Sequence, residues 1–474
     1  MRSRARVDGL VDRGEPVYGV TTGFGALAHT LVPADKRTEL QRALLLSHAA
    51  GMGDPVEREV VRAMMFLRAR TLARGYSGVS LAVVEQIVAL LNADVCPVVP
   101  EYGSLGASGD LAPLAHVGIV LIGEGLVHTA TGTEPASETL RRIDRQPVEL
   151  GAKDGLALIN GTDGILGMLV MAIVDIDRLL KTAEVAAAMT VEGLLGTTRP
   201  FASDLQALRP QVGQADSAAN LMTLLAESPI VASHRHDDPR VQDAYSVRCT
   251  PQVIGAARDT LAFARTTAER ELISAIDNPV VLEDGRIESC GNFHGAPLAY
   301  ACDFLAIALA DVSALVERRV DRMLDAVRSE GLPAFLAPDP GVNSGMMIAH
   351  YTAAAIVAVN RRLAVPASAD TLPTSASQED HVSMGWSAAR KLRIVVHNLA
   401  RVIAVELVAA SHAIDFRRPI KPAAATSAVV GLIRAHVDEA GADRFLGPDL
   451  TAVEELVLSG AVLAAAESIT GPLR

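Results

Sequence analysis

The chain has 474 residues and a formal net charge of −12 at pH 7, and half of its residues are hydrophobic but only 3% are aromatic. The acidic balance opposes binding to nucleic acid or to an anionic membrane, so a soluble protein that binds a small molecule is expected. The length allows a large core of two or three domains. A core made of Ala, Leu and Val rather than aromatic residues favours helices.

The four cysteines show no CxxC spacing, so neither a disulfide framework nor a zinc site is expected, and a reducing cytoplasm fits. The first six residues are basic and lack an apolar run, so they do not predict a secretory signal. The apolar run 164–174 is far shorter than the ~20 residues that span a bilayer. We therefore expect no membrane partner.

Residues 14–30 contain Tyr-Gly-Val-Thr-Thr-Gly-Phe-Gly at 18–25. The glycine spacing resembles a nucleotide-binding fingerprint, but no βαβ unit follows it, so that interpretation is rejected. The segment predicts a tight loop, or a lid that presents Tyr18. Apolar residues recur at helical spacing over 33–93, and Ser47-His48 stands at the end of the first of these helices.

Residues 103–116 read Gly-Ser-Leu-Gly-Ala-Ser-Gly-Asp-Leu-Ala-Pro-Leu-Ala-His, and a helix is predicted over 111–122. Three glycines in seven residues favour tight bends, because glycine takes a positive φ without steric strain. In a tight bend the Gly109 nitrogen can attack the carbonyl carbon of Ala107. Loss of one water from the ring and one from Ser108 would leave an electrophilic methylidene-imidazolone. By itself the tripeptide is more typical of a turn before a helix, and a phosphate cradle is a further possibility.

The remainder of the chain predicts long helices joined by polar segments. Residues 129–146 are loop-like, and 198–240 is a mixed connector. Between them an apolar helix is predicted to run to about 196, and Asn160 either caps it or points its amide at a ligand. The sequence Ser-His-Arg-His-Asp-Asp at 233–238 could bind a metal, but Pro239 and the neighbouring charges favour a solvated loop, so no metal is expected. The predicted elements that follow are a helix over 242–276, a hairpin with an Asp-Gly turn over 280–287, helices over 296–324 and 346–363, a polar loop over 366–384, and helices over 386–413, 423–440 and 450–468. Helices this long and apolar predict a mainly α fold with a long helix bundle that is buried between subunits.

Seven blocks of the sequence resemble, in the same order, motifs of the histidine, phenylalanine and tyrosine ammonia-lyases. They are Tyr-Gly-Val-Thr-Thr-Gly-Phe-Gly at 18–25, Gly-Ala-Ser-Gly-Asp-Leu-Ala-Pro-Leu-Ala-His at 106–116, Asn-Gly-Thr at 160–162, Tyr-Ser-Val-Arg-Cys at 245–249, Asp-Asn-Pro at 277–279, Gly-Asn-Phe-His at 291–294 and Gln-Glu-Asp-His-Val-Ser-Met at 378–384. The resemblance is closest to the bacterial histidine ammonia-lyases of the actinobacterial type. One departure is that only 17 residues precede Tyr18, whereas the family usually has a few dozen there.

The resemblance implies the architecture of the fumarase/aspartase-like superfamily. A smaller N-terminal region, 1–160, would bear the prosthetic group, and 161–474 would form the long-helix bundle of the same catalytic unit. Family members are homotetramers whose active sites combine residues from three subunits. The prosthetic group is 4-methylidene-imidazol-5-one (MIO), which here would form autocatalytically from Ala107, Ser108 and Gly109, with no dissociable cofactor.

The resemblance also assigns roles to individual side chains. Tyr18 would be the base, which requires that its phenol pKa be lowered in the site. Arg248 would hold the substrate carboxylate as a bidentate fork, although pairing with an acidic residue of this chain would explain it as well. Tyr245 and Asn160 would orient the substrate amine and the MIO oxygen. Gln242 and Phe293 would line the site near the ring. His48 and Glu379 would contact the substrate imidazole.

Two positions favour L-histidine as the substrate. Members that act on Phe or Tyr carry Phe-Leu or His-Leu in place of Ser47-His48, and Asn-Gln in place of Gln378-Glu379. An imidazole offers a donor and an acceptor to His48 and Glu379. A phenyl ring would leave both buried and unpaired, which costs roughly 1–3 kcal/mol for each group. The implied reaction is elimination of ammonia from L-histidine to give trans-urocanate.

Three alternatives stay open at this point. The first is a phenylalanine or tyrosine ammonia-lyase or aminomutase with the same electrophile. The second is a helical lyase of the fumarase and argininosuccinate type, which would have no ring. The third is a helical oligomer without catalysis. An intact mass short by two waters and an assay for urocanate distinguish these four interpretations.

Overall fold

The computed structural model describes residues 2–13, 15–236, 238 and 240–474. The described chain is mainly α-helical, which confirms the predicted fold class. It forms two compact units: unit 1 comprises Met1–Met171, Arg265–Asp303 and Pro366–Arg390, and unit 2 comprises Ala172–Ala264, Phe304–Val365 and Lys391–Arg474. These units differ from the predicted regions 1–160 and 161–474, because 265–303 and 366–390 fold with the N-terminal part of the chain.

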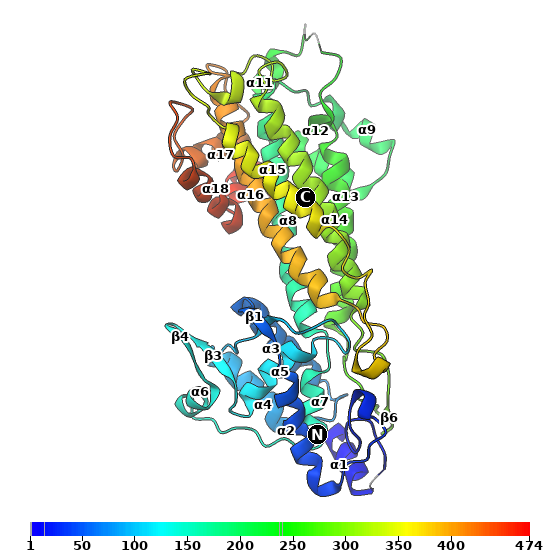
Figure 1. The fold of residues 1–474 in the computed structure, drawn as a ribbon. Helices are drawn as coiled ribbons and strands as arrows, with labels where there is room; N and C mark the ends of the chain where they lie inside the picture. Colours follow the sequence, from blue (N-terminus) through cyan, green and yellow to red (C-terminus); the bar gives the residue numbers. More distant parts are fainter. Residues whose placement is uncertain (1, 14, 237, 239) are drawn as a thin grey trace. The chain divides into compact units, whose positions relative to one another are not determined.

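Unit 1 contains short helices (Figure 1) and three two-stranded antiparallel sheets. Its helices are α1 (Arg2–Arg13), α2 (Arg37–His48), α3 (Arg58–Ala73), α4 (Leu81–Asn92), α5 (Leu111–Leu121), α6 (Ala136–Arg142) and α7 (Asp154–Ile159). The antiparallel sheets pair β1 (Met52–Pro55) with β2 (Pro100–Tyr102), β3 (Leu126–Thr129) with β4 (Gly132–Pro135), and β5 (Val280–Val281) with β6 (Ile287–Glu288). The predicted helix 111–122 and hairpin 280–287 are confirmed. The loop predicted over 129–146 is wrong, because β4 and α6 form there.

The long helices supply most of unit 2. They are α8 (Asp163–Gly193), α13 (Thr250–Leu272), α14 (Ala296–Leu324), α15 (Met347–Leu363) and α16 (Gly385–Asp415), and shorter helices are α9 (Ser203–Ala207), α10 (Val212–Leu224), α11 (Pro229–Ser233), α12 (Tyr245–Arg248), α17 (Ala424–Arg434), α18 (Gly447–Ser459) and α19 (Ala461–Thr470). The ends of α8, α13, α14 and α16 belong to unit 1. The single helix predicted over 450–468 is wrong, because Gly460 takes a left-handed φ of 83° and separates α18 from α19. Likewise, the helix predicted over 242–276 is divided into α12 and α13.

A buried polar network joins the long helices within unit 2. The guanidinium of Arg319 on α14 is fully buried and donates to both carboxylate oxygens of Glu406 on α16. Thr190 of α8 also donates to Glu406 at 2.8 Å, and Arg319 donates to the hydroxyl of Thr250 on α13 at 3.3 Å. Removing one partner of such a pair leaves a buried charge and costs about 3–5 kcal/mol. The network therefore fixes the register of four helices.

Two helices, α14 and α16, are long and apolar enough to cross a bilayer by length and composition. However, 61% and 83% of their apolar windows are buried inside the protein. Each helix also carries a member of the buried Arg319–Glu406 pair. These properties are those of core helices.

Candidate active site

The glycine-rich loop that precedes α5 is tightly bent. Gly106 and Gly109 both take a positive φ, 76° and 73°, and their backbones form a bridge with each other. Gly109 also lies against Gly161, so a Cβ on Gly109 would come within 2.1 Å of the Gly161 carbonyl oxygen. The hydroxyl of Ser104 donates to the Gly109 carbonyl at 3.2 Å. The bend predicted from the glycine spacing is thus present on both sides of Ala107-Ser108.

Asp110 connects this loop to the start of α8. Its N–H donates to Gly161 O at 2.7 Å, and its carboxyl oxygen Oδ2 accepts N–H bonds from Gly164 at 2.8 Å and Ile165 at 3.0 Å. Burial raises the pKa of Asp110 to about 8, against the lowering effect of the Ile165 N–H. Burial thus makes Asp110 a weaker acid than an exposed aspartate, a property that the sequence did not predict.

Asn160 lies beside Ser108. The Ser108 hydroxyl donates to the side-chain oxygen of Asn160. The Asn160 NH₂ group donates to Asp277 Oδ1 at 3.2 Å and to Asn278 O at 2.7 Å. The second oxygen of Asp277 accepts from Lys153 Nζ at 2.6 Å. Lys153 and Asp277 were not predicted as site residues, although Asp277 begins one of the seven blocks.

Tyr18, His48 and Glu379 form a second group in unit 1. The Gly25 N–H donates to the Tyr18 hydroxyl at 3.0 Å, and the charge of Glu379 acts on both Tyr18 and His48. Burial raises the pKa of Tyr18; the Gly25 N–H opposes this shift and Glu379 adds to it. Burial lowers the pKa of His48. The lowering expected for the Tyr18 phenol is therefore not supplied by the described residues around it.

The loop that carries Glu379 is fastened to the glycine-rich loop. Met384 N donates to Leu105 O at 3.0 Å, and the Ser383 hydroxyl donates to Gly106 O at 3.4 Å. The indole N–H of Trp386 donates to Glu101 O at 2.7 Å. Glu379 itself accepts from the Thr374 hydroxyl at 2.9 Å. These bonds hold the 378–384 loop at a fixed place beside Gly106.

Phe293 lies half-buried on the turn before α14. The next residue, His294, stacks on His381 with ring centroids 5.7 Å apart and an angle of 2° between the rings. This stack joins the turn that carries Phe293 to the 378–384 loop within unit 1.

Gln242, Tyr245 and Arg248 lie in unit 2, on and just before α12. Gln242 is exposed, and Tyr245 is 71% exposed. The Arg248 guanidinium carbon lies 4.5 Å from the centroid of the Tyr245 ring, a cation–π contact. Arg248 Nε is buried and has no hydrogen-bond partner in the part of the chain described. An oxygen acceptor for this donor is therefore missing from the described chain.

Of the eleven predicted side chains, eight lie in unit 1 and three in unit 2. Those in unit 1 are Tyr18, His48, Ala107, Ser108, Gly109, Asn160, Phe293 and Glu379.

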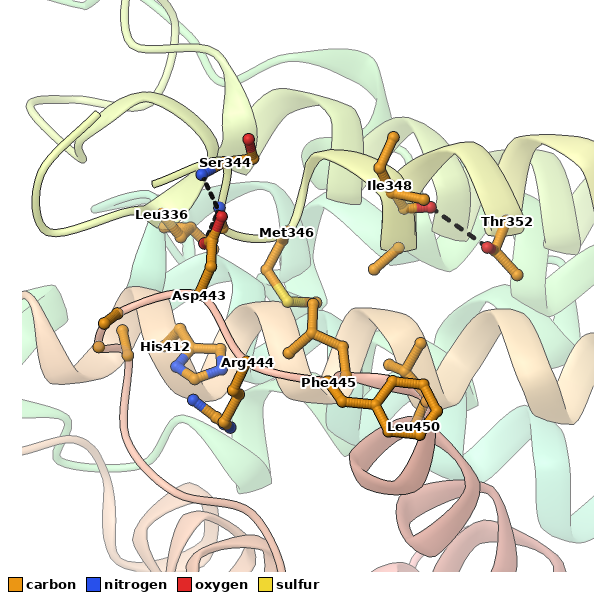
Figure 2. Close-up of a pocket in the computed structure, with 17 residues that line it drawn as sticks. Leu336, Ser344, Met346, Ile348, Thr352, His412, Asp443, Arg444, Phe445 and Leu450 are labelled. Atoms are coloured by element: carbon orange, nitrogen blue, oxygen red, sulfur yellow. Dashed lines mark hydrogen bonds between the residues drawn. The ribbon is translucent and has the colours of Figure 1, made fainter. Parts of the chain in front are cut away.

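Figure 2 shows a cavity of about 400 Å³ in unit 2 whose lining includes none of these predicted residues. His412 lies on its wall, and burial lowers the pKa of this imidazole to about 3, so the ring is neutral near pH 7. Asp443 accepts N–H bonds from Ser344 at 2.7 Å and Gly345 at 2.9 Å, which fixes the loop at the cavity edge. A second cavity, of about 550 Å³, lies in unit 1 beside Glu271 and His294.

The candidate metal segment 233–238 is only partly described, since Asp237 and Pro239 lie outside the described residues. The ring nitrogens of His234 bond the carbonyl oxygens of Ile230 at 3.0 Å and Gly196 at 3.2 Å. Among the residues that the structure covers, no group of three His, Cys, Asp or Glu side chains could hold a metal. All four cysteines are free thiols.

Comparisons with known proteins give a consistent result. A sequence model of the family described as aromatic amino acid lyase matches residues 1–435. The histidine ammonia-lyases of Streptomyces avermitilis and Streptomyces coelicolor are 58% and 59% identical, over 99% and 100% of this chain and 92% and 93% of theirs. Tyrosine aminomutase from Streptomyces globisporus superposes with a TM-score of 0.94 at 38% identity, covering 100% of this chain and 93% of that one. Histidine ammonia-lyase from Trypanosoma cruzi superposes with a TM-score of 0.91 at 39% identity, covering 99% and 88%.

Proposed function

Since the chain belongs to the aromatic amino acid lyase family, we propose that it eliminates ammonia from L-histidine to give trans-urocanate. The observation that carries this choice is that unit 1 contains both His48 and Glu379. These are two polar groups that an imidazole can satisfy. The identity of 58–59% to the two Streptomyces histidine ammonia-lyases supports the same substrate.

The loop 106–109 has the features that formation of MIO requires. Gly106 and Gly109 bend the chain, no side chain fits at Gly109, and Asn160 holds the Ser108 hydroxyl. Once formed, the ring supplies an electrophile that draws electrons from the substrate and activates the departure of its amine. No dissociable cofactor is then needed.

Tyr18 takes the proton from Cβ of the substrate. This carbon is barely acidic, so the base must be positioned and its pKa suited to the task. The Gly25 N–H donates to the phenol oxygen and stabilises the phenolate, whereas burial and Glu379 favour the neutral phenol. A cation close to Tyr18 would lower its pKa. L-Histidine carries such a cation in its ammonium group.

The substrate carboxylate binds Arg248. A guanidinium presents a planar fork that matches a carboxylate, and the buried Nε of Arg248 has no partner among the described residues. The Tyr245 ring holds the guanidinium in place by the cation–π contact. Tyr245 and Asn160 orient the amine and the ring oxygen, and Gln242 and Phe293 line the imidazole site.

The enzyme is a cytoplasmic homotetramer in which three subunits contribute to each site. Two observations support this assembly. Gln242 and Tyr245 are exposed in unit 2 although both bind substrate in this proposal. In addition, the long helices of unit 2 expose large apolar side chains, of which Tyr351 is 61% exposed and Ile348 is 60% exposed. Large exposed apolar patches mark protein–protein contacts.

The test is to add L-histidine and to follow urocanate by its absorbance, with the intact mass measured on the same sample. Urocanate formation together with a mass short by two waters supports the proposal. The structural similarity to tyrosine aminomutase makes L-tyrosine the decisive competitor. Consumption of L-tyrosine but not of L-histidine, with 4-coumarate or β-tyrosine as the product, would contradict L-histidine as the substrate. The same result would support MIO as the electrophile. A normal mass with no turnover would mean a helical oligomer without catalysis.

A further inference from the structure

The side chain of Asn160 is held on both sides, and only one orientation of its amide fits. Its oxygen accepts from the Ser108 hydroxyl. Its NH₂ group donates to two acceptors, Asp277 Oδ1 at 3.2 Å and Asn278 O at 2.7 Å. Turning the amide over would place its oxygen against two oxygen acceptors and would present NH₂ to Ser108.

Asp277 is itself fixed by a buried cation. Lys153 Nζ lies 2.6 Å from Asp277 Oδ2, and the side chains of Lys153 and Asp277 are 0% and 1% exposed. Lys153 also takes a left-handed φ of 69°, a conformation that is strained for a residue with a side chain. Burying a lysine in a strained conformation with one carboxylate partner destabilises the folded state. Strained backbone conformations are more frequent at functional sites than elsewhere.

Arg68 braces the backbone on both sides of the same contact. Its guanidinium is fully buried and donates to Asn160 O at 2.9 Å and to Ile276 O at 2.8 Å. Ile276 precedes Asp277, so Arg68 holds together the two backbone segments whose side chains meet. Two buried cations, Arg68 and Lys153, thus converge on the Asn160–Asp277 contact.

We propose that Lys153 and Asp277 are positioning residues for formation of the MIO ring, because they orient the Asn160 amide so that its oxygen faces the Ser108 hydroxyl. This inference rests on the proposed function, in which Ala107-Ser108-Gly109 forms the ring. The side chains of Lys153 and Asp277 act through Asn160.

The step that they control is the loss of water from Ser108. In ring formation the Gly109 nitrogen bonds to the carbonyl carbon of Ala107. The Ala107 oxygen leaves as water with the amide protons of Ser108 and Gly109. Ser108 then loses its Cα proton and its hydroxyl as the second water, which leaves a Cα–Cβ double bond. The hydroxyl can depart only from the rotamer in which the Cβ–Oγ bond overlaps the forming π-system, and the Asn160 oxygen selects the rotamer of Ser108.

The test uses Asp277→Asn, which keeps the shape and removes the charge. An asparagine at 277 must turn its oxygen to Lys153, so its NH₂ faces the NH₂ of Asn160, and only Asn278 O then favours the native orientation of the Asn160 amide. The full-length protein is refolded from denaturant, and the intact mass of its soluble fraction is followed with time. We expect loss of the second water to be roughly 10²-fold slower than in wild type, the effect of an ångström-scale misplacement. Far-UV circular dichroism and the thermal unfolding midpoint are measured on the same samples.

A second variant covers the outcome in which Asp277→Asn does not fold. In Lys153→Met/Asp277→Leu both charges are removed together, so no buried charge is left unpaired. It should fold and should also convert more slowly, because the Asn160 NH₂ group keeps only Asn278 O as an acceptor. Wild-type conversion rates in either soluble variant would overturn the inference. A residue with only a structural role would lower the unfolding midpoint and leave the conversion rate unchanged.

Glu184→Gln is the matched control. Glu184 is fully buried in unit 2, where it accepts from Asn220 at 2.7 Å and pairs with Arg258 at 3.4 Å. This variant should lose stability and should still lose both waters at the wild-type rate. If wild type itself shows no loss of water, the proposed function fails. If wild type converts and Asp277→Asn converts equally fast, only the positioning role fails.

Discussion

Ser108 and Arg248 differ in whether residues of the same chain supply their hydrogen-bond partners. The Ser108 hydroxyl donates to Asn160, and the Asn160 amide donates to Asp277. Lys153 holds Asp277, and the Arg68 guanidinium donates to the Asn160 carbonyl, all within unit 1. Around Arg248 in unit 2, the neighbouring Tyr245 is 71% exposed and the Arg248 Nε has no partner among the described residues.

The difference separates two requirements of the proposed reaction. Ring formation is an intramolecular step, so its groups must be aligned within one chain before any substrate arrives. Substrate binding needs a surface that a ligand and neighbouring subunits can reach. Substitutions near Ser108 should therefore change the mass deficit that results from loss of water. Substitutions near Arg248 should leave that deficit complete and change only the kinetics with L-histidine.

The largest effect is expected at Ser108. Ser108→Ala has no hydroxyl to lose, so its intact mass should lack the deficit of two waters. The kcat/KM for L-histidine should fall by roughly 10⁴-fold, the scale on which a central catalytic group is lost. Intact mass spectrometry and the urocanate assay check both. Turnover at the wild-type rate in this variant would show that the electrophile lies elsewhere.

Arg248→Lys should lower kcat/KM by roughly 10- to 100-fold and leave the mass deficit complete. Lysine keeps the charge but loses the planar fork, and a hydrogen bond to a charged group is worth about 1.5–3 kcal/mol. Steady-state kinetics with L-histidine measure the change. Arg209→Lys, at an exposed position of the same unit, should be neutral. A missing mass deficit in Arg248→Lys would contradict the independence of the two regions.

Glu379→Gln should raise the KM for L-histidine about tenfold, because a charge-assisted hydrogen bond to imidazole becomes a neutral one. It should also shift the pH profile. The carboxylate of Glu379 raises the pKa of Tyr18, so its removal lowers that pKa and moves the acidic limb of kcat/KM to lower pH. Glu138→Gln, which is exposed in unit 1, should leave the profile in place. A limb that moves to higher pH would argue against Tyr18 as the base.

Asp110 should also affect the pH dependence of the free energy of unfolding. Its pKa is raised from 3.8 to about 8, so between these values the folded protein holds a proton that the unfolded chain has released. Stability should therefore fall as pH rises from about 4 to 8, with a slope of up to about 1.4 kcal/mol per pH unit. Asp110→Asn removes this slope, which urea unfolding at several pH values would show. An unchanged slope would mean that Asp110 is ionised in the folded protein.

His412 should act in the opposite direction in unit 2. Its pKa is lowered from 6.5 to about 3. Between these values His412 is protonated in the unfolded chain and neutral in the folded protein. Stability should fall as pH drops from about 6.5 toward 3, and His412→Gln should reduce this loss. Urea unfolding between pH 4 and 7 measures it, with His436→Gln on the described surface as the control.

Apolar periodicity and glycine spacing predicted the elements whose structure depends on neighbouring residues in the sequence. The helix expected over 296–324 has those bounds as α14, because an unbroken apolar periodicity without glycine or proline in its interior leaves few alternatives. The glycine spacing predicted the positive φ values at Gly106 and Gly109. Gly460 was overlooked, because a single glycine inside a helical pattern is compatible with either a continuous helix or a break.

The missed residues act through contacts between distant parts of the chain. Lys153 and Asp277 are 124 positions apart, and no periodicity indicates that two segments will bury opposite charges against each other. The sequence places Asp110 only within the glycine-rich block, because its shifted pKa comes from burial in the folded chain.

The bond from the Trp386 indole to Glu101 O has an optical consequence. The chain contains one tryptophan, and it is 2% exposed. A Cβ placed on Gly164 would meet its ring at 2.5 Å and Asp110 Oδ2 at 3.2 Å. Emission excited in this indole therefore originates from a single point next to the start of α8. Its wavelength and intensity report whether the neighbourhood of the glycine-rich loop is packed, independently of the helix content seen by circular dichroism. Every variant above can thus be examined for local packing without a label.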